Sequence, residues 1–421
     1  MSRKAVITGL GFVTSIGNDR AAVTQSLRTL HHGLERVEFL ANPKLPVTVA
    51  GTIKDFTATS PDWRDWRFPE GYELPRETLR SLPPHGLYAI CAVEQALGDA
   101  RLAAADITDG DTGLYCASAG SAFLLHHHLA HMHGVRGERG NPMGVLSSIA
   151  GTLNFNLAAH YGIRGAVGGF ASACASSSHA LGCALDDIRL GRQRRMLVVG
   201  AEEANAETIL PFSAMRVLSV NSDPATASRP FDRSRDGFVG AGGAVCLVLE
   251  DGDLALKRNA PIYAEMAGWG QAADGYNVAV PHPEGAGLAE AMRRALADSE
   301  VGPAGIDYVN AHAASTPAGD RSEALALRRV FSGNGVRPRV SSTKGLTGHP
   351  LSMSGVMEAA FCALALADGF IPGNAHLVDP DEACAGLDLP RTTLDTAPGQ
   401  VLNNSSGFGG SNVCHVFRRW T

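Results

Sequence analysis

The chain has 421 residues, 45% of them hydrophobic, and its 36 basic and 42 acidic residues give a formal net charge of −6. This length suits two or three domains with a large core, and the acidic balance argues against a nucleic-acid-binding protein, which usually carries a basic surface. The eight cysteines are scattered without CxxC spacing, no signal peptide is recognisable, and no apolar run approaches the roughly 20 residues of a membrane span. These features predict a reduced, cytoplasmic enzyme.

In chain order, the first half begins with an apolar segment, residues 5–8, that predicts a buried strand. The "GLG" after it resembles a dinucleotide-binding fingerprint, but Thr14 stands where the third glycine belongs, so we interpret it as a strand-ending turn. Apolar spacing then predicts a helix over 88–104, a strand over 112–117, a helix over 155–161 and a strand over 196–200. A helix that starts near Cys174 would lie between strands, as in a βαβ unit.

The second half continues this alternation after a polar turn over 251–259, which joins strands predicted at 244–250 and 262–269. It goes on with helices over 287–299, 322–331 and 354–368, a strand over 308–310, and two closing strands around a glycine-rich turn. Strands that alternate with helices predict an α/β fold. The order of elements suggests a duplicated architecture, although no sequence repeat is visible.

Cys174 stands in "GGFASACASSSHALG", directly before the predicted helix. A thiol at a helix N-terminus lies in the positive end of the helix dipole, which would lower its pKa and favour the thiolate. A small buried cysteine without chemistry is the alternative reading. His312 lies in the small-residue turn of "VNAHAASTPAGDRSE", where Asp320 is the expected N-cap of the next helix and Glu323 completes a capping box.

Lys344 and His349 stand in a third polar stretch, "SSTKGLTGHPLSMSG". A lysine in such apolar, glycine-rich surroundings needs a partner if it is buried. The fourth stretch, "NNSSGFGGSN" at 403–412, has glycines spaced closely enough to bring backbone against a ligand. One Cys, two His and a glycine-rich segment are the parts of covalent acyl chemistry. Composition and spacing alone do not define the reaction more closely than this.

Four stretches, in their order along the chain, resemble the motifs of the β-ketoacyl-acyl-carrier-protein synthases of the elongating Cys-His-His type. They are "SACASSSHALG", "VNAHAASTPAGD", "SSTKGLTGH" and "NNSSGFGGSN". "SRPFDRSRDGFVGAGGA", residues 228–244, is similar to a further stretch of that family, and the similarity runs from Ala5 to Phe417. The resemblance implies a thiolase fold, with duplicated α/β halves in a five-layer αβαβα arrangement. We expect a first half, 1–251, with the nucleophilic Cys and a second half, 252–421, with the two His.

The resemblance also implies the catalytic roles. Cys174 would take the acyl chain from an acyl carrier protein, and His312 and His349 would polarise the thioester carbonyl of the incoming malonyl unit during its decarboxylation. Lys344 would hold His349 and the charge balance of the site, with Glu323 as its partner.

The resemblance also implies which residues bind the substrates. The amides of Cys174 and Phe408 would form the oxyanion hole, and Phe408 would gate the second substrate. Thr316 would bind the phosphopantetheine arm, and Phe212 would line the acyl pocket. The resemblance implies a carrier-docking surface near four arginines, Arg76, Arg80, Arg136 and Arg139. It implies no metal, nicotinamide or flavin, and either a homodimer or a heterodimer with a related subunit.

Two positions depart from the family pattern. Ala314 replaces the first threonine of H-G-T-S-T-P, and Ser406 replaces the first aromatic residue of N-S-F-G-F-G-G. Ala314 removes a hydroxyl expected at pantetheine, a loss of about 0.5–1.5 kcal/mol per hydrogen bond, and Ser406 removes a bulky side chain near the site. These departures favour a specialised synthase, for example one that extends polyene or aryl-polyene chains beside a second subunit.

Two other functions compete with a condensing enzyme that acts in fatty-acid or specialised chain elongation, and one segment resembles a metal site. A non-catalytic or partner-dependent subunit of the chain-length-factor type would typically lack the nucleophilic cysteine, which is present here. A degradative thiolase needs a second catalytic cysteine, but Cys414 lacks the C-x-G-x-G surround. The histidine-rich segment 126–133 spaces His127 and His131 as metal ligands, but no carboxylate or cysteine joins them.

Overall fold

The computed structural model describes residues 3–42, 44–72, 74–134, 140–332 and 337–421. Arg136 and Arg139, two of the four arginines expected at a docking surface, lie outside the described residues. All eight cysteines are free.

The described residues form one large mixed sheet with the strand order β10-β9-β11-β12-β8-β1-β7-β6-β4-β5. Its strands are β1 Ala5–Val13, β4 Thr112–Ala117, β5 Val167–Phe170, β6 Arg195–Glu202, β7 Gly243–Asp251, β8 Ala264–Ala273, β9 Tyr308–Asn310, β10 Arg339–Ser341, β11 Gln400–Gly407 and β12 Ser411–Arg418. A small separate pair contains β2 Leu34–Arg36 and β3 Val49–Gly51.

The helices cover and divide this sheet. They are α1 Arg20–Thr29, α2 Arg76–Leu79, α3 Pro84–Asp99, α4 Ala104–Ile107, α5 Ala122–Gly134, α6 Thr152–Tyr161, α7 Ser176–Arg189, α8 Ala206–Ile209, α9 Pro224–Ala227, α10 Gly252–Lys257, α11 Ala286–Asp298, α12 Pro317–Phe331, α13 Lys344–Thr347 and α14 Ser354–Asp368. A 3-10 turn, η5 Leu351–Met353, precedes α14.

The sheet consists of two halves with the same topology. In the first, β5, β4 and β6 run parallel, and β7 and β1 follow as antiparallel neighbours. In the second, β10, β9 and β11 run parallel, and β12 and β8 follow in the same way. The halves join where β1 pairs antiparallel with β8. This is the duplication that the order of elements suggested.

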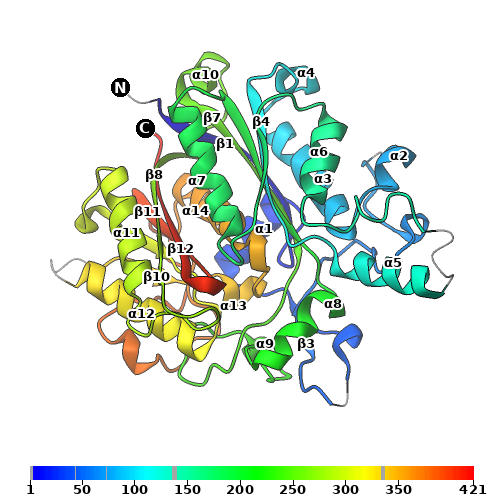
Figure 1. Cartoon of the computed structure of the whole chain (residues 1–421). Helices are drawn as coiled ribbons and strands as arrows, with labels where there is room; N and C mark the ends of the chain where they lie inside the picture. Colours follow the sequence, from blue (N-terminus) through cyan, green and yellow to red (C-terminus); the bar gives the residue numbers. More distant parts are fainter. Residues whose placement is uncertain (1–2, 43, 73, 135–139, 333–336) are drawn as a thin grey trace.

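The helices complete a five-layer arrangement. α7 and α14 pack against each other and against strands of both sheet halves, and the largest core cluster lies around them. α3 packs on the outer face of the first half, and α11 packs on the outer face of the second. Figure 1 shows α3 and α6 on one side of the molecule and α11 and α12 on the other. The predicted αβαβα arrangement is confirmed.

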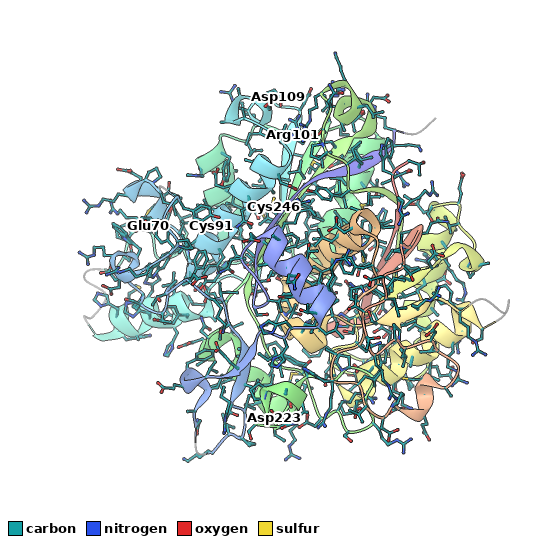
Figure 2. All side chains as sticks on the ribbon, turned by 180° about the vertical axis from the view of Figure 1, so that it is seen from behind. Glu70, Cys91, Arg101, Asp109, Asp223 and Cys246 are labelled. Atoms are coloured by element: carbon teal, nitrogen blue, oxygen red, sulfur yellow. The ribbon has the colours of Figure 1, made fainter. Side chains whose placement is uncertain are left out.

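The interpretation of "GLG" as a strand-ending turn was wrong, because both glycines lie inside β1. A Cβ at Gly11 would stand 1.8 Å from the carbonyl oxygen of Ala92 on α3, and one at Gly9 would stand 2.3 Å from that of Ala96. The missing side chains therefore allow α3 to pack directly on the strand. Figure 2 shows Cys91 of α3 and Cys246 of β7 inside the molecule, where both belong to the core between helix and sheet.

Several boundaries differ from the prediction by a few residues; the helix predicted at 88–104, for example, is α3, Pro84–Asp99. The turn over 251–259 contains α10, whose N-cap is Asp251. α12 begins at Pro317, with Thr316 as its N-cap. Asp320 therefore lies in the first turn of α12, where its carboxylate accepts hydrogen bonds from the amides of Thr316 and Phe231.

The segment 351–368 is long and apolar enough to cross a membrane by length and composition, but 83% of it is buried inside the protein. It is the helix that fills the middle layer, so its hydrophobicity is explained by packing.

Candidate active site

The turns that precede α7 and α14 meet the end of β9 and the turn between β11 and β12 around a pocket of about 200 Å³. The structure brings nine predicted residues to its wall: Cys174, Phe212, His312, Ala314, Thr316, Glu323, His349, Ser406 and Phe408. Lys344 is fully buried behind this wall. Arg76 and Arg80 are exposed on or beside α2 and do not line the pocket.

Cys174 stands in a tight turn between β5 and α7. Ala173 has a positive φ of 52°, a conformation that costs energy for a residue with a side chain. The turn is stabilised by the Ser176 hydroxyl, which donates to the Ala173 carbonyl at 2.6 Å and accepts from the Ser172 amide at 2.8 Å. Gly407 lies against this turn, since a Cβ there would be 3.2 Å from the Cys174 nitrogen. The backbone of β11 thus reaches the nucleophile candidate.

The Cys174 thiol does not behave as the sequence predicted. Burial raises its pKa to about 12, and the nearby Lys344 ammonium opposes this effect only in part. α7 begins at Ser176, two residues after Cys174. The expected lowering by the helix dipole is therefore outweighed by desolvation. Cys174 rests as a thiol, and a base must take its proton before it can act as a nucleophile.

His349 is placed to be that base. Its Nε2 lies 3.0 Å from Cys174 Sγ, and its Nδ1 lies 3.0 Å from the Ser354 hydroxyl at the start of α14. Burial, and after it the Lys344 charge, holds the pKa of His349 well below its usual value. The ring is therefore neutral and has a lone pair that can accept a proton. Its direct partner is Ser354, whereas Lys344 acts on it through charge.

His312 lies beside His349 at the end of β9. The two ring centroids are 5.3 Å apart and the rings are nearly perpendicular. Burial, followed by the charge of Lys344, also lowers the pKa of His312 well below its usual value. Its Nδ1 has no hydrogen-bond partner among the residues that the structure describes. Two neutral imidazoles therefore face the pocket together.

The predicted pairing of Lys344 with Glu323 was wrong. The Lys344 ammonium binds Glu358 of α14, and both side chains are fully buried. Glu323 instead accepts hydrogen bonds from the amides of His312, at 2.9 Å, and Ala313, at 2.6 Å, and from the Asn404 side chain at 2.9 Å. Glu323 thus holds the turn that carries His312.

Sequence reasoning missed Glu358 and Ser354. A signal for Glu358 was available, because it is the only charged residue in the apolar run "SGVMEAAFCALALA", and a lone carboxylate inside a core helix needs a partner. Ser354 carried no comparable signal, since serine is common at the start of a helix.

Aromatic and polar side chains line the rest of the pocket. The ring of Phe408 lies 6.2 Å from that of Phe212, which in turn lies 5.4 Å from Phe238. Ser406 donates to the Asn412 side-chain oxygen at 2.8 Å, so a polar contact stands where the family pattern has an aromatic residue. Ala314 packs in an apolar cluster with Phe238.

The sequence matches the family models "Beta-ketoacyl synthase, N-terminal domain" over residues 2–255 and "Beta-ketoacyl synthase, C-terminal domain" over residues 263–378. The chain belongs to the β-ketoacyl synthase family. It is 37% identical to 3-oxoacyl-[acyl-carrier-protein] synthase 1 of Haemophilus influenzae and 36% identical to that of Escherichia coli K12, over 99% of each chain. It is 32% identical to 3-oxoacyl-[acyl-carrier-protein] synthase 2 of Staphylococcus aureus N315 over the whole chain and 99% of the relative.

Solved structures of ketosynthases also superpose closely on this chain. A β-ketoacyl synthase from Burkholderia phymatum STM815 superposes with a TM-score of 0.90 at 31% identity, with both chains fully covered. The ishigamide ketosynthase/chain length factor superposes with a TM-score of 0.89 at 27% identity, also over both full chains. The thiolase fold and the activity class, a condensing acyltransferase that acts as a β-ketoacyl-ACP synthase, are therefore confirmed.

Proposed function

We propose that this β-ketoacyl synthase carries its growing acyl chain on Cys174 and extends it by decarboxylative condensation with malonyl-acyl-carrier protein. The observation that supports these residue roles is the 3.0 Å contact between His349 Nε2 and Cys174 Sγ, with neutral His312 beside it. The only further group required is the phosphopantetheine arm, which arrives on the carrier protein. Thr316, on the pocket wall, is the proposed contact for that arm.

In the first step the Cys174 proton passes to His349 Nε2, and the sulfur attacks the thioester carbonyl carbon of the acyl carrier. The amides of Cys174 and Phe408 stabilise the oxyanion. When the intermediate collapses, the carbon–sulfur bond to the carrier breaks, and the departing thiolate of the carrier takes the proton from His349 and leaves as a thiol. The acyl chain remains on Cys174.

In the second step the malonyl thioester carbonyl lies between the two imidazoles. The bond to the carboxylate breaks, carbon dioxide leaves, and the electron pair forms an enolate that N–H groups of His312 and His349 stabilise. The enolate carbon attacks the acyl carbonyl on Cys174, a carbon–carbon bond forms, and the carbon–sulfur bond breaks. The Cys174 sulfur leaves as a thiolate and takes a proton from solvent, which restores the resting thiol. The Ser354 hydroxyl can donate to or accept from His349 Nδ1, so His349 can act as acceptor in the first step and donor in the second.

Ala314 and Ser406 support a role outside ordinary fatty-acid synthesis. Both residues line the pocket, and Ser406 places a hydroxyl where a bulky ring is usual. We propose a specialised polyene or polyketide chain as the substrate. A partner-dependent subunit of the chain-length-factor type is less well supported, because the Cys174, His312 and His349 geometry is complete.

The partners proposed are the carrier protein and a second synthase subunit. Arg76 and Arg80 are exposed and available for an acidic carrier. A surface of exposed apolar side chains, here called the α5–β5 patch, is the proposed subunit interface; its members are Leu125, Leu129, Met132, Val145, Leu146, Ile149, Phe155 and Val167. We propose a homodimer in the cytoplasm, and a division of the chain between residues 251 and 252.

Intact-protein mass spectrometry tests the proposal. The enzyme is mixed with carrier proteins that hold saturated, polyunsaturated or aryl chains, and we expect a mass gain with at least one of them. The gain should vanish in Cys174→Ala, while His312→Ala should be acylated but fail to condense with malonyl-carrier protein. Acylation of Cys174→Ala at the wild-type rate would refute the assignment of the nucleophile.

A further inference from the structure

Glu202, at the end of β6, stands close to the active site without lining its pocket. Its side chain is 1% exposed. Gly200, two residues earlier, faces the same way because strand residues alternate, and a Cβ there would lie 3.0 Å from the Cα of Met353. The end of β6 is therefore pressed against η5, and Glu202 points at the turn that follows His349.

The contacts of the Glu202 carboxylate tie two loops together. Its Oε1 accepts from the hydroxyl of Ser352 and from the amide of Ala119 at 3.1 Å. Its Oε2 is buried without a hydrogen-bond partner among the described residues. Ser352 stands between His349 and Ser354, and the Ser354 hydroxyl is the partner of His349 Nδ1. The Glu202 carboxylate therefore binds the turn that carries both of these residues.

The charge of Glu202 also acts on the nucleophile. It is one of the groups that raise the pKa of Cys174, together with Glu358 and against Lys344. Burial raises the pKa of Glu202 itself to about 7. The hydrogen bond from Ser352, then His85 of α3 and the Ala119 amide, oppose this rise in pKa, and Glu203 adds to it. The ionised and neutral forms of Glu202 therefore exchange in the pH range where the enzyme would be assayed.

We propose that Glu202 is a positioning residue for the condensation. Through Ser352 it fixes the turn that orients His349 against Cys174, and its negative charge keeps the proton on sulfur until His349 removes it. This inference rests on the proposed function, because it assigns Glu202 a task only if Cys174 is the nucleophile and His349 its base.

Two variants separate these effects, and a third controls for them. Glu202→Gln removes the charge but keeps an oxygen acceptor for Ser352, whereas Ser352→Ala removes the link and leaves the charge. Glu203→Gln is the matched control: it is the adjacent residue, is 2% exposed, and faces His85 and Asn205 instead of η5. Thermal unfolding of each variant shows whether it is folded.

The first readout is the alkylation of Cys174 by iodoacetamide between pH 6 and 9, followed by peptide mass spectrometry. The thiolate fraction rises about tenfold for each unit by which a thiol pKa falls. We expect Glu202→Gln to react at least about threefold faster at pH 8, because a negative charge near the sulfur is removed. In the wild type, the plot of the logarithm of the alkylation rate against pH should change slope near pH 7 as Glu202 ionises. That change of slope should be absent in Glu202→Gln. Ser352→Ala and Glu203→Gln should stay within about twofold of wild type at pH 8.

The second readout is the steady-state condensation rate. Misplacement of a catalytic group by about 1 Å can lower a rate by about a hundredfold, so we expect kcat to fall at least tenfold in Ser352→Ala, with KM nearly unchanged. Glu202→Gln keeps an acceptor for Ser352, so its kcat should stay within about threefold of wild type. Glu203→Gln should retain wild-type kcat.

The outcomes distinguish the two proposals. If no carrier acylates the wild type, the proposed function fails, and the alkylation profile still reports whether Glu202 acts on Cys174. If the wild type condenses but Glu202→Gln is alkylated at the rate of Glu203→Gln at every pH, the charge part of the inference is overturned. A folded Ser352→Ala with wild-type kcat would overturn its positioning part.

Discussion

At the scale of single residues, the charge on Lys344 determines the electrostatics of the site. Burial depresses the pKa of both His312 and His349, and the buried Lys344 ammonium adds to this effect while it counters the rise that burial causes in the pKa of Cys174. The site can hold this cation because Glu358 pairs with it in the core. Burial and this ion pair together keep the imidazoles neutral without making the thiol a resting thiolate.

Lys344→Met should be strongly destabilising, because it leaves the Glu358 carboxyl buried without its cation. Breaking a buried pair by removing one partner costs about 3–5 kcal/mol, and urea unfolding would measure the loss. The double variant Lys344→Met with Glu358→Leu should recover most of it. Lys54→Met is the control, since its pair with Glu35 is half exposed and such pairs contribute about 1 kcal/mol or less. Equal losses in the two single variants would contradict this account.

The residues with distinctive chemistry could be predicted from the sequence, and their supports could not. Cys174, His312 and His349 stand in motifs of recognisable composition, and the structure brings them to one pocket. Glu358, 14 residues from Lys344, carried a signal that was missed. Glu202 carried none, because its contact with Ser352 joins residues 150 positions apart. No local pattern distinguishes Glu202 from Glu203, because the alternation of a strand decides which one faces the turn.

At the scale of elements, α7 and α14 position the chemistry. Each follows a turn that carries one of the proposed reacting side chains, Cys174 or His349, and the two helices pack together in the middle layer. The contact is close: a Cβ at Gly355 of α14 would stand 2.0 Å from the Ser178 hydroxyl and 2.8 Å from its amide nitrogen. The spacing of these helices therefore sets the distance between nucleophile and base.

Gly355→Ala should push the helices apart. Added volume in a packed core costs about 1–3 kcal/mol, and the acylation rate should fall at least tenfold because the Cys174–His349 contact lengthens. Gly98→Ala is the control, because Gly98 is in helix α3 with nothing within 4 Å of its added Cβ, so a gain of up to about 1 kcal/mol is expected. Chemical denaturation would measure the stability of each variant, and rapid-quench experiments would measure its acylation rate. An unchanged acylation rate in Gly355→Ala would argue against this role of the helix contact.

Most elements were predictable because their patterns are local. The strands at 112–117 and 308–310 and the helix at 354–368 have the predicted bounds. The "GLG" segment was misread because its glycines serve the approach of α3, a contact with residues about 80 positions away. The start of α12 was placed five residues late because Pro317 is well suited to the first turn of a helix.

At the scale of the whole molecule, the surface is not uniform. The α5–β5 patch gathers exposed apolar side chains from α5, the segment before α6, α6 and the edge strand β5. An exposed edge strand and a large apolar patch both favour association with another chain. The proposed dimer would cover them together.

Phe155→Asp, in this patch, should convert the proposed dimer to a monomer. A charge at the centre of an apolar interface loses its hydration without gaining a partner, and light scattering coupled to size-exclusion chromatography would measure the mass. Val378→Asp is the control, because Val378 is equally apolar and highly exposed but lies outside the patch. A dimeric Phe155→Asp would show that the subunits meet elsewhere.

Acid stability should reflect the buried histidine of the last strand. Burial lowers the pKa of His415 to about 4, and its Nε2 donates to the Ser178 carbonyl at 3.0 Å. Because the folded pKa is depressed, its contribution is complete above about pH 6.5 and is lost as the pH falls toward 4. Between pH 7 and 4.5, wild type should lose about 2–3 kcal/mol more than His415→Gln. Urea unfolding at both pH values tests this prediction. An equal loss of unfolding free energy in wild type and His415→Gln would contradict it.

The join between β1 and β8 has a consequence for how activity is related to folding. Cys174 belongs to one sheet half, and His312 and His349 belong to the other, so the reacting groups meet only across the seam. A molecule whose halves have separated loses the β1–β8 pairing and has no partner for its thiol, even where the strands within each half stay paired. With the proposed roles of Cys174 and His349, turnover therefore requires the two halves to be docked.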